Sequence, residues 1–178
     1  MLKKYFLIVV CCVMSLILLA EENDNRGYVV KVGDVAPDFC IKTSNDSSIL
    51  LSSLRGKVVM LQFTASWCKV CRREMPYIEK EIWRKHFQNS HFVLFGIDYQ
   101  ETKQAVADFI TATGVSYPIA YDTDGAIFIK YAESNAGITR NVIIDTDGRI
   151  VFLTRLFSQS EFEEMCRIID NLLVDISN

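Results

Sequence analysis

The sequence predicts an α/β domain in which helices flank a central mixed β-sheet. Nearly continuous apolar runs, of which Val58–Phe63 is the clearest, are typical of strands buried on both faces. Apolar residues then recur at the spacing of one helix face: Cys71, Met75, Ile78 and Ile82. Strands and helices go on to alternate, and the chain finishes with a hairpin signal and a helix. This order of elements places parallel and antiparallel strands in one sheet.

Two short strands are expected ahead of the central sheet. Val35–Phe39 leads into the first strand, and Ile49–Leu51 pairs with it after the polar turn Ser44–Ser48. The turn Leu54–Lys57 then precedes the buried run. These residues predict an N-terminal strand extension that comes before the main sheet.

The first long helix starts near Cys68. Pro76 should kink this helix after about two turns, because proline lacks a backbone donor and its ring crowds the preceding turn. The strand Phe92–Ile97 follows, and the next helix ends at Gly114, a residue typical of helix C-termini. Pro118–Tyr121 is expected to form one more short strand.

The last third of the chain predicts a short helix, a hairpin and a final helix. Ala126–Tyr131 is expected to be the short helix. The strands Asn141–Asp145 and Ile150–Thr154 flank an Asp-Gly pair, which is a strong signal for a tight hairpin turn. The final helix opens with Ser160 and Glu163 at the spacing of a capping box.

Residues 1–20 form a separate unit that predicts export. Lys3 and Lys4 precede an apolar run of about 16 residues, which is long for a signal peptide and short for a full membrane span. A cleaved signal peptide, a retained membrane anchor and lipid attachment at Cys11 or Cys12 are all open at this point. An exported protein, periplasmic or at the cell envelope, is expected in each case.

The rest of the chain divides into a polar tether over residues 21–34 and a single domain over residues 35–176. Hydrophobic residues make up 50% of the sequence and charged residues 23%, so a packed core is expected. The net charge is −3, and the sequence has no run of Lys and Arg. A mildly acidic domain of this kind lacks the electrostatic surface that nucleic-acid binding requires.

Cys68 and Cys71 stand where the buried strand meets the helix. Unpaired N–H groups and the helix dipole at a helix N-terminus favour an anion, so Cys68 should have a lowered pKa and act as the attacking thiolate. Cys71 lies one turn deeper on the apolar face, which suits the resolving role. A zinc site would need two more ligands, and His86 and His91, about four turns away, do not form a second ligand pair. The pair is therefore interpreted as redox-active, with no metal.

Two further cysteines follow the leader, out of six in the whole chain. Cys40 follows Phe39 in the first predicted strand, and Cys166 lies in the apolar stripe of the last helix. Both are interpreted first as small buried apolar residues. An oxidising compartment would also permit a Cys40–Cys166 bridge, which spacing alone does not establish.

The stretch Val58–Pro76, with Trp-Cys-x-x-Cys followed by Glu-x-Pro, resembles the active-site segment of thioredoxin-like proteins of the TlpA/ResA type. The resemblance runs from about Val35 to the last helix. It implies a thioredoxin-like fold with a central β–α insertion, which Tyr117–Tyr131 is expected to supply.

The same resemblance implies a thiol–disulfide oxidoreductase that acts on protein thiols and disulfides and receives electrons from an upstream thiol donor. It favours a reductase, with cytochrome c maturation as one setting. No cofactor is expected. A domain outside the cytoplasm, associated with the membrane through the N-terminal segment, is also implied.

The resemblance assigns roles near the cysteines. Trp67 corresponds to the residue that shields the disulfide. Glu74 matches the acidic residue thought to handle protons in that family; read by itself, it can face the same side of the helix as Cys71 or be a solvated carboxylate. Gln62 stands where thioredoxin has a buried aspartate, so proton transfer by that route is absent.

The loop before the penultimate strand departs from the family pattern. Where the family places a cis-proline against the cysteines, this chain has Thr139, followed by Arg140. A non-proline cis bond costs about 2.5–4 kcal/mol, so a trans bond or a strained loop is expected. The loop presents backbone to client thiols in the family. Arg140 is expected either to stabilise the thiolate or to be a solvated loop residue.

Two rival functions are carried forward. A threonine and an arginine in this loop are also found in peroxiredoxins, yet the peroxide motif needs a proline that does not precede Thr64 here. The other rival is a non-catalytic thioredoxin-like binding module at the cell envelope.

Overall fold

The structure is a computed structural model that describes residues 26–42 and 48–176. The predicted leader, the first part of the tether and most of the turn Ser44–Ser48 lie outside the described residues. The strands are β1 (Cys40–Lys42), β2 (Ser48–Leu50), β3 (Val58–Thr64), β4 (Phe92–Tyr99), β5 (Ile119–Asp122), β6 (Arg140–Ile144) and β7 (Ile150–Arg155). The helices are α2 (Lys69–Tyr77), α3 (Arg84–His86), α4 (Lys103–Thr113) and α5 (Gln159–Ile176). Shorter turns are η2 (Leu51–Leu54), η3 (Ile78–Trp83, π-helical) and η4 (Phe128–Lys130).

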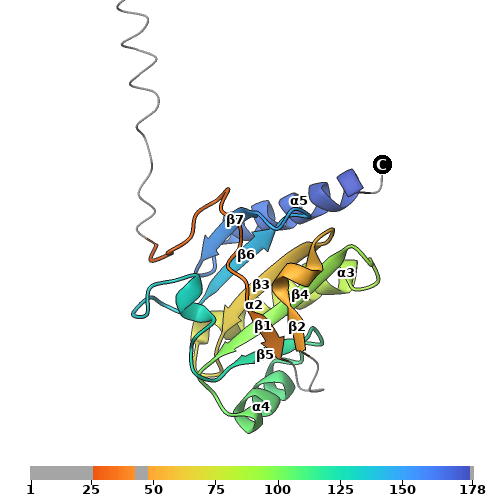
Figure 1. Ribbon diagram of the computed structural model, residues 1–178. Coiled ribbons are helices and arrows are strands. Elements are labelled where there is room, and N and C mark those ends of the chain that lie inside the picture. Colours follow the sequence, from red (N-terminus) through yellow and green to blue (C-terminus); the bar gives the residue numbers. More distant parts are fainter. Residues whose placement is uncertain (1–25, 43–47, 177–178) are drawn as a thin grey trace, which may run out of the picture.

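The main sheet has five strands in the order β5-β4-β3-β6-β7 (Figure 1). β3, β4 and β5 run parallel, whereas β6 is antiparallel to both β3 and β7. A separate two-stranded antiparallel sheet, β1-β2, precedes it in the chain. The predicted thioredoxin-like fold, with its central mixed sheet and N-terminal strand extension, is confirmed.

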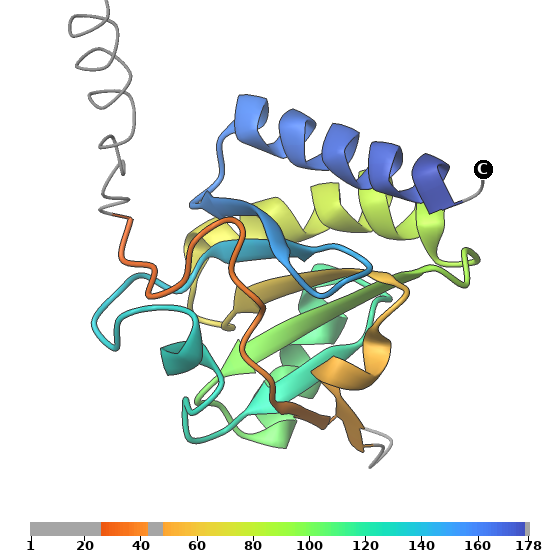
Figure 2. The same cartoon turned by 45° about the horizontal axis from the view of Figure 1, so that its top comes forward.

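Both faces of the sheet are covered. All seven residues of β3 are buried, as its continuous apolar run predicts, and its apolar residues alternate between two hydrophobic clusters. One cluster joins β3 to helices α2, α4 and α5 through Met75, Phe109 and Met165. Figure 2 shows α5 beside the run of helix from α2 to α3 on this side of the sheet. The cysteine pair belongs to the other cluster.

The second face is covered by the N-terminal segment and the turn η4. Tyr28 is buried and forms a β-bridge with Ala132, and its ring lies beneath the Arg140 guanidinium. The backbone N–H of Gly33 donates to the carbonyl of Ile150. Residues 26–34, expected as part of the tether, therefore pack on the domain. No helix among residues 26–42 and 48–176 is long and apolar enough to cross a membrane.

Pro76 interrupts the first helix as predicted. The α-helix ends at Tyr77, and the chain continues through the π-helical turn η3 before α3 begins. Proline has no N–H to donate to the carbonyl four residues earlier, which weakens the helix at this point. The apolar face continues through the interruption, because Met75, Ile78 and Ile82 are all buried.

The central insertion and the hairpin lie where the sequence predicts them. β5 adds a parallel edge strand beside β4, and the short helix expected after it is the three-residue turn η4. The hairpin between β6 and β7 turns through Gly148, whose φ of 78° favours glycine. The predicted capping box is wrong: α5 begins at Gln159, so Ser160 lies inside the helix, and Glu163 accepts from the Gln159 amide.

Candidate redox site

Cys68 caps the N-terminus of α2. Its backbone is extended (φ −80°, ψ 103°), and its sulfur accepts a hydrogen bond of 3.2 Å from the backbone N–H of Cys71. The two sulfurs lie at disulfide-bonding distance, and the Cα atoms are 5.3 Å apart. Cys68 is 9% exposed, whereas Cys71 is completely buried. Of the two residues, only Cys68 therefore has surface exposed to solvent, and its role as the attacking thiolate stays a prediction.

Thr139 lies directly against both cysteines. Its Oγ1 is 3.1 Å from the sulfur of Cys68 and 3.2 Å from that of Cys71, and the residue is 3% exposed. The described residues contain no cis peptide bond, so the bond before Thr139 is trans. The N–H of Leu156 donates to the Thr139 carbonyl and ties the loop to the end of β7. The predicted place of Thr139 is confirmed, and its effect on clients stays a prediction.

The turn before Cys68 is held from two sides. Both the backbone N–H and the hydroxyl of Ser66 donate to the Glu101 carboxylate. The Nε of Arg72 donates to the Ser66 carbonyl at 2.6 Å. Trp67 follows in this fixed turn with 62% of its surface exposed. Its indole is available to a client protein, and its shielding of the disulfide stays a prediction.

Glu74 is buried, with 2% of its surface exposed, so the alternative of a solvated carboxylate is wrong. Its Oε1 accepts from the side-chain amide of Asn141 at 2.8 Å, and its Oε2 accepts from that of Gln62 at 3.4 Å. Gln62 and Asn141 face each other across β3 and β6. The Tyr117 hydroxyl donates to the oxygen of Gln62 at 2.6 Å, and Asn141 also donates to the Thr154 hydroxyl at 2.8 Å.

The proton affinity of Glu74 suits acid–base work near neutrality. Burial raises its pKa to about 7, against the lowering effect of the two amide donors and of the nearby Arg73 charge. A carboxyl with such a pKa can both take up and release a proton at physiological pH. The role itself stays a prediction, whereas the buried position is a finding.

A second buried carboxyl lies near the start of α2. Asp98 ends the apolar run of β4 and pairs with Thr64 across the parallel strands. It is 1% exposed, and neither of its carboxylate oxygens has a hydrogen-bond partner within the described residues. Burial and the negative charge of Glu101 raise its pKa to about 7. The protein therefore carries two buried carboxyl groups, Glu74 and Asp98, whose pKa values lie well above the usual range for a carboxyl group.

Arg140 is buried against the N-terminal segment. It is completely buried at the start of β6, so the expectation of a solvated loop arginine is wrong. Its guanidinium lies 4.4 Å from the centre of the Tyr28 ring and donates to the carbonyls of Gly137 and Arg26. These contacts attach the N-terminal segment to the domain. An effect of Arg140 on the thiolate stays a prediction.

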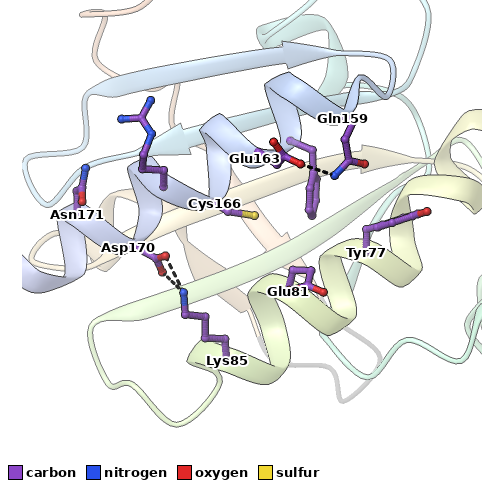
Figure 3. Close-up of a pocket in the computed structure, with 10 residues that line it drawn as sticks. Tyr77, Glu81, Lys85, Gln159, Glu163, Cys166, Asp170 and Asn171 are labelled. Carbon is purple, nitrogen blue, oxygen red and sulfur yellow. Dashed lines mark hydrogen bonds and ion pairs between the residues drawn. The ribbon is translucent and has the colours of Figure 1, made fainter.

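The other two described cysteines are free thiols and do not form the bridge that was left open. Cys40 is exposed on β1, so its expected burial is wrong, and Cys166 is half-buried in α5. Figure 3 shows Cys166 in a groove of about 650 Å³ between α5 and the helical run from α2 to α3, beside the ion pair of Lys85 and Asp170. Burial raises the pKa of Cys166 to about 11, so this thiol stays protonated and unreactive.

Sequence reasoning missed three members of the site: Asn141, Tyr117 and Asp98. Two signals were available. Asp98 directly follows the apolar run Phe92–Ile97 near the carboxyl end of a parallel strand, and the carboxyl ends of such strands gather functional residues. Asn141 is a polar residue that opens an apolar strand. Tyr117 had no local signal, because its hydroxyl reaches Gln62, 55 positions earlier in the chain, only through tertiary packing. No cluster of three or more metal-ligating side chains lies among residues 26–42 and 48–176.

Comparison with known proteins agrees with this geometry. Residues 31–169 match the Redoxin family. The chain is 33% identical over 122 residues to the thiol-disulfide oxidoreductase ResA of Bacillus subtilis, covering 68% of this chain and 66% of that protein. It is 30% identical over 160 residues to ResA of Geobacillus thermodenitrificans, covering 84% and 87% of the two chains. The chain thus spans about two thirds of the length of the Bacillus subtilis relative and most of the other.

Solved structures show the same fold. A solution structure described as that of a candidate protein disulfide isomerase from Bacteroides thetaiotaomicron superposes with a TM-score of 0.81 at 54% identity, over 83% of this chain and 93% of that one. A crystal structure described as that of a candidate thiol:disulfide interchange protein DsbE from Chlorobium tepidum, at a TM-score of 0.68 and 22% identity over 81% and 99% of the two chains, shares the fold. This chain belongs to the Redoxin family, among its thioredoxin-fold thiol–disulfide oxidoreductases.

Proposed function

We propose that the protein reduces disulfides of client proteins outside the cytoplasm through Cys68 and Cys71. The observation that carries the proposal is the difference between the two sulfurs. Cys68 caps a helix N-terminus and is reachable, whereas Cys71 is completely buried within disulfide-bonding distance of it. A reachable nucleophile beside a shielded resolving thiol is the arrangement that thiol–disulfide exchange needs.

The reaction proceeds in two exchanges. The Cys68 thiolate attacks one sulfur of the client disulfide, a mixed disulfide forms, and the other client sulfur leaves as a thiolate that takes up a proton. Cys71, once deprotonated, attacks the sulfur of Cys68 and releases the second client thiolate, which is protonated in turn. Two electrons and two protons pass to the client, and the Cys68–Cys71 disulfide remains. An upstream thiol donor then reduces this disulfide.

Glu74 is proposed as the group that accepts the proton of Cys71. It lies one turn farther along the same helix than Cys71, is buried, and has a pKa of about 7. The amides of Gln62 and Asn141 each donate to one of its oxygens and hold the carboxyl in place. Trp67, exposed next to Cys68, is proposed to contact the client.

Two observations weigh against a peroxidase. The Thr64 hydroxyl is buried against the sulfur of Met75, and the Arg140 guanidinium is bound to carbonyls and the Tyr28 ring. Thr64 and Arg140 are therefore not assembled around Cys68 as a peroxide site would require, and Thr139 is the threonine whose hydroxyl contacts the Cys68 sulfur. A binding module would not require two cysteine sulfurs at disulfide-bonding distance, whereas thiol–disulfide exchange does.

The activity is tested with the purified full chain, insulin and dithiothreitol as the thiol donor. Insulin should be reduced at least tenfold faster than by dithiothreitol alone, and hydrogen peroxide should be consumed no faster than by an unrelated dithiol protein. Peroxide turnover that exceeds insulin reduction would favour the peroxidase, and no effect on either substrate would favour the binding module.

Export is tested separately. The basic residues Lys3 and Lys4 ahead of an apolar run support translocation of the rest of the chain. Full-length protein produced in a bacterial host should be digested by protease added outside the cytoplasmic membrane. A Lys3→Glu, Lys4→Glu variant should be exported less efficiently. Protection of the wild-type protein from external protease would contradict the location without touching the proposed chemistry.

A further inference from the structure

The Thr139 hydroxyl has the two reacting sulfurs as its hydrogen-bond partners. Its Oγ1 is 3.1 Å from one and 3.2 Å from the other, and within the part of the chain that the structure describes it bonds to nothing else. The residue is 3% exposed, so water offers little alternative. Buried hydroxyls donate their hydrogen wherever an acceptor is in reach. Here both acceptors in reach are atoms that change charge during the reaction.

We propose that Thr139 is a catalytic residue whose hydroxyl donates its hydrogen bond first to the Cys68 thiolate and then to the Cys71 thiolate. In the reduced protein the negative charge is on Cys68. Once Cys68 is bound to the client in the mixed disulfide, the charge must form on Cys71. The hydroxyl is nearly equidistant from both sulfurs, so rotation about one C–O bond lets a single hydrogen follow the charge.

The position supports this role in a second way. Thr139 is the residue immediately before β6, and its carbonyl accepts a 3.1 Å hydrogen bond from the backbone N–H of Leu156. The hydroxyl therefore already lies beside both sulfurs before a thiolate forms, and no conformational entropy has to be lost at that moment. A donor that is already oriented stabilises a developing anion more than a mobile one. The inference rests on the proposed function, since it assigns a role in the same exchange.

The test compares Thr139→Val, which removes the hydroxyl at nearly constant shape, with Thr139→Ser, which keeps it. The pKa of Cys68 is measured in a Cys71→Ser background from the pH dependence of iodoacetamide labelling and from thiolate absorbance. Thr139→Val should raise this pKa by about one unit or more, because a hydrogen bond to a charged group is lost. Labelling well below the pKa should then slow about tenfold. Thr139→Ser should stay close to wild type.

The second thiolate is tested through the resolving step. With Cys71 intact and Cys68 bound to glutathione, the rate at which glutathione is released reports attack by Cys71. Thr139→Val should shift the pH profile of this rate upward by about one unit, and Thr139→Ser should not. Ile138→Val, which removes one methyl from the neighbouring buried side chain, is the packing control and should leave both profiles unchanged.

Unchanged profiles in Thr139→Val, or equal shifts in the valine and serine variants, would overturn the inference. If Thr139→Val unfolds, as a urea midpoint would reveal, Thr139→Ala gives the same comparison with a smaller side chain. Neither the labelling nor the glutathione release needs a client protein. If these profiles shift but the wild-type protein does not reduce insulin, the proposed function is contradicted. The role of the hydroxyl is then still supported.

Discussion

Cys68→Ser is expected to abolish disulfide reduction, whereas Cys71→Ser is expected to accumulate the protein covalently linked to its client. The first variant lacks the nucleophile, because the remaining thiol of Cys71 is completely buried and out of reach of a client. The second keeps the reachable thiol at the helix N-terminus but cannot resolve the mixed disulfide. The fold should tolerate either change, since serine differs from cysteine by one atom.

Non-reducing electrophoresis with insulin or a periplasmic extract, followed by mass spectrometry of the linked peptide, measures this difference. Cys166→Ser is the control, because that thiol lies in the groove beside α5 with a raised pKa and should leave turnover unchanged. Mixed disulfides on Cys71 in the Cys68→Ser variant, or full turnover in either variant, would refute the assignment of roles.

The free energy of unfolding is expected to fall between about pH 4.5 and pH 7, and Glu74→Gln should remove much of this fall. The pKa of Glu74 is about 7 in the folded protein, against an ordinary value of 4.5. The folded state therefore binds the proton more tightly than the unfolded chain, so stability is lost as the pH rises through this window. For a fully buried group the loss is on the order of a few kcal/mol.

Urea unfolding at pH 5 and pH 8 tests this expectation. The free energy of unfolding of Glu74→Gln should be close to that of the wild type at pH 5 and higher than that of the wild type at pH 8. Asp98→Asn should show the same sign, because burial also raises the pKa of Asp98 to about 7. Glu81→Gln, a change at an exposed carboxylate paired with Lys80, should show no such pH dependence. A wild-type protein more stable at pH 8 than at pH 5 would contradict the burial of two protonated carboxyls.

The same Glu74→Gln variant also tests whether the carboxyl takes part in the resolving step, in addition to its effect on the free energy of unfolding. A glutamine cannot accept the proton of Cys71, so resolution of the mixed disulfide should slow on the order of 100-fold near pH 7. Asp98→Asn should affect stability more than this rate, because Asp98 ends β4 whereas Glu74 shares α2 with Cys71. If resolution in Glu74→Gln kept the wild-type rate and pH profile, the carboxyl would be structural.

Local sequence patterns predicted most of the fold. Continuous apolar runs marked β3 and β4, and the spacing of Met75, Ile78 and Ile82 marked the buried helix face. Backbone chemistry marked the boundaries at Pro76 and Gly148. These features depend on neighbours a few residues away, which is why they can be read directly from the chain. The start of α5 was misplaced, since helix boundaries depend on contacts that spacing alone does not contain.

The sequence by itself determined the chemistry, because a Cys-x-x-Cys at a strand–helix junction places one thiol at a helix N-terminus whatever the rest of the fold does. Only the tertiary structure decided what surrounds that pair. Burial of Glu74 between Gln62 and Asn141 depends on the pairing of β3 with β6, which brings together these two residues from positions 79 apart in the chain. The contact of Thr139 with both sulfurs spans a similar separation. Proton affinities and hydrogen-bond partners follow from desolvation and distance, and both arise only when remote segments pack together.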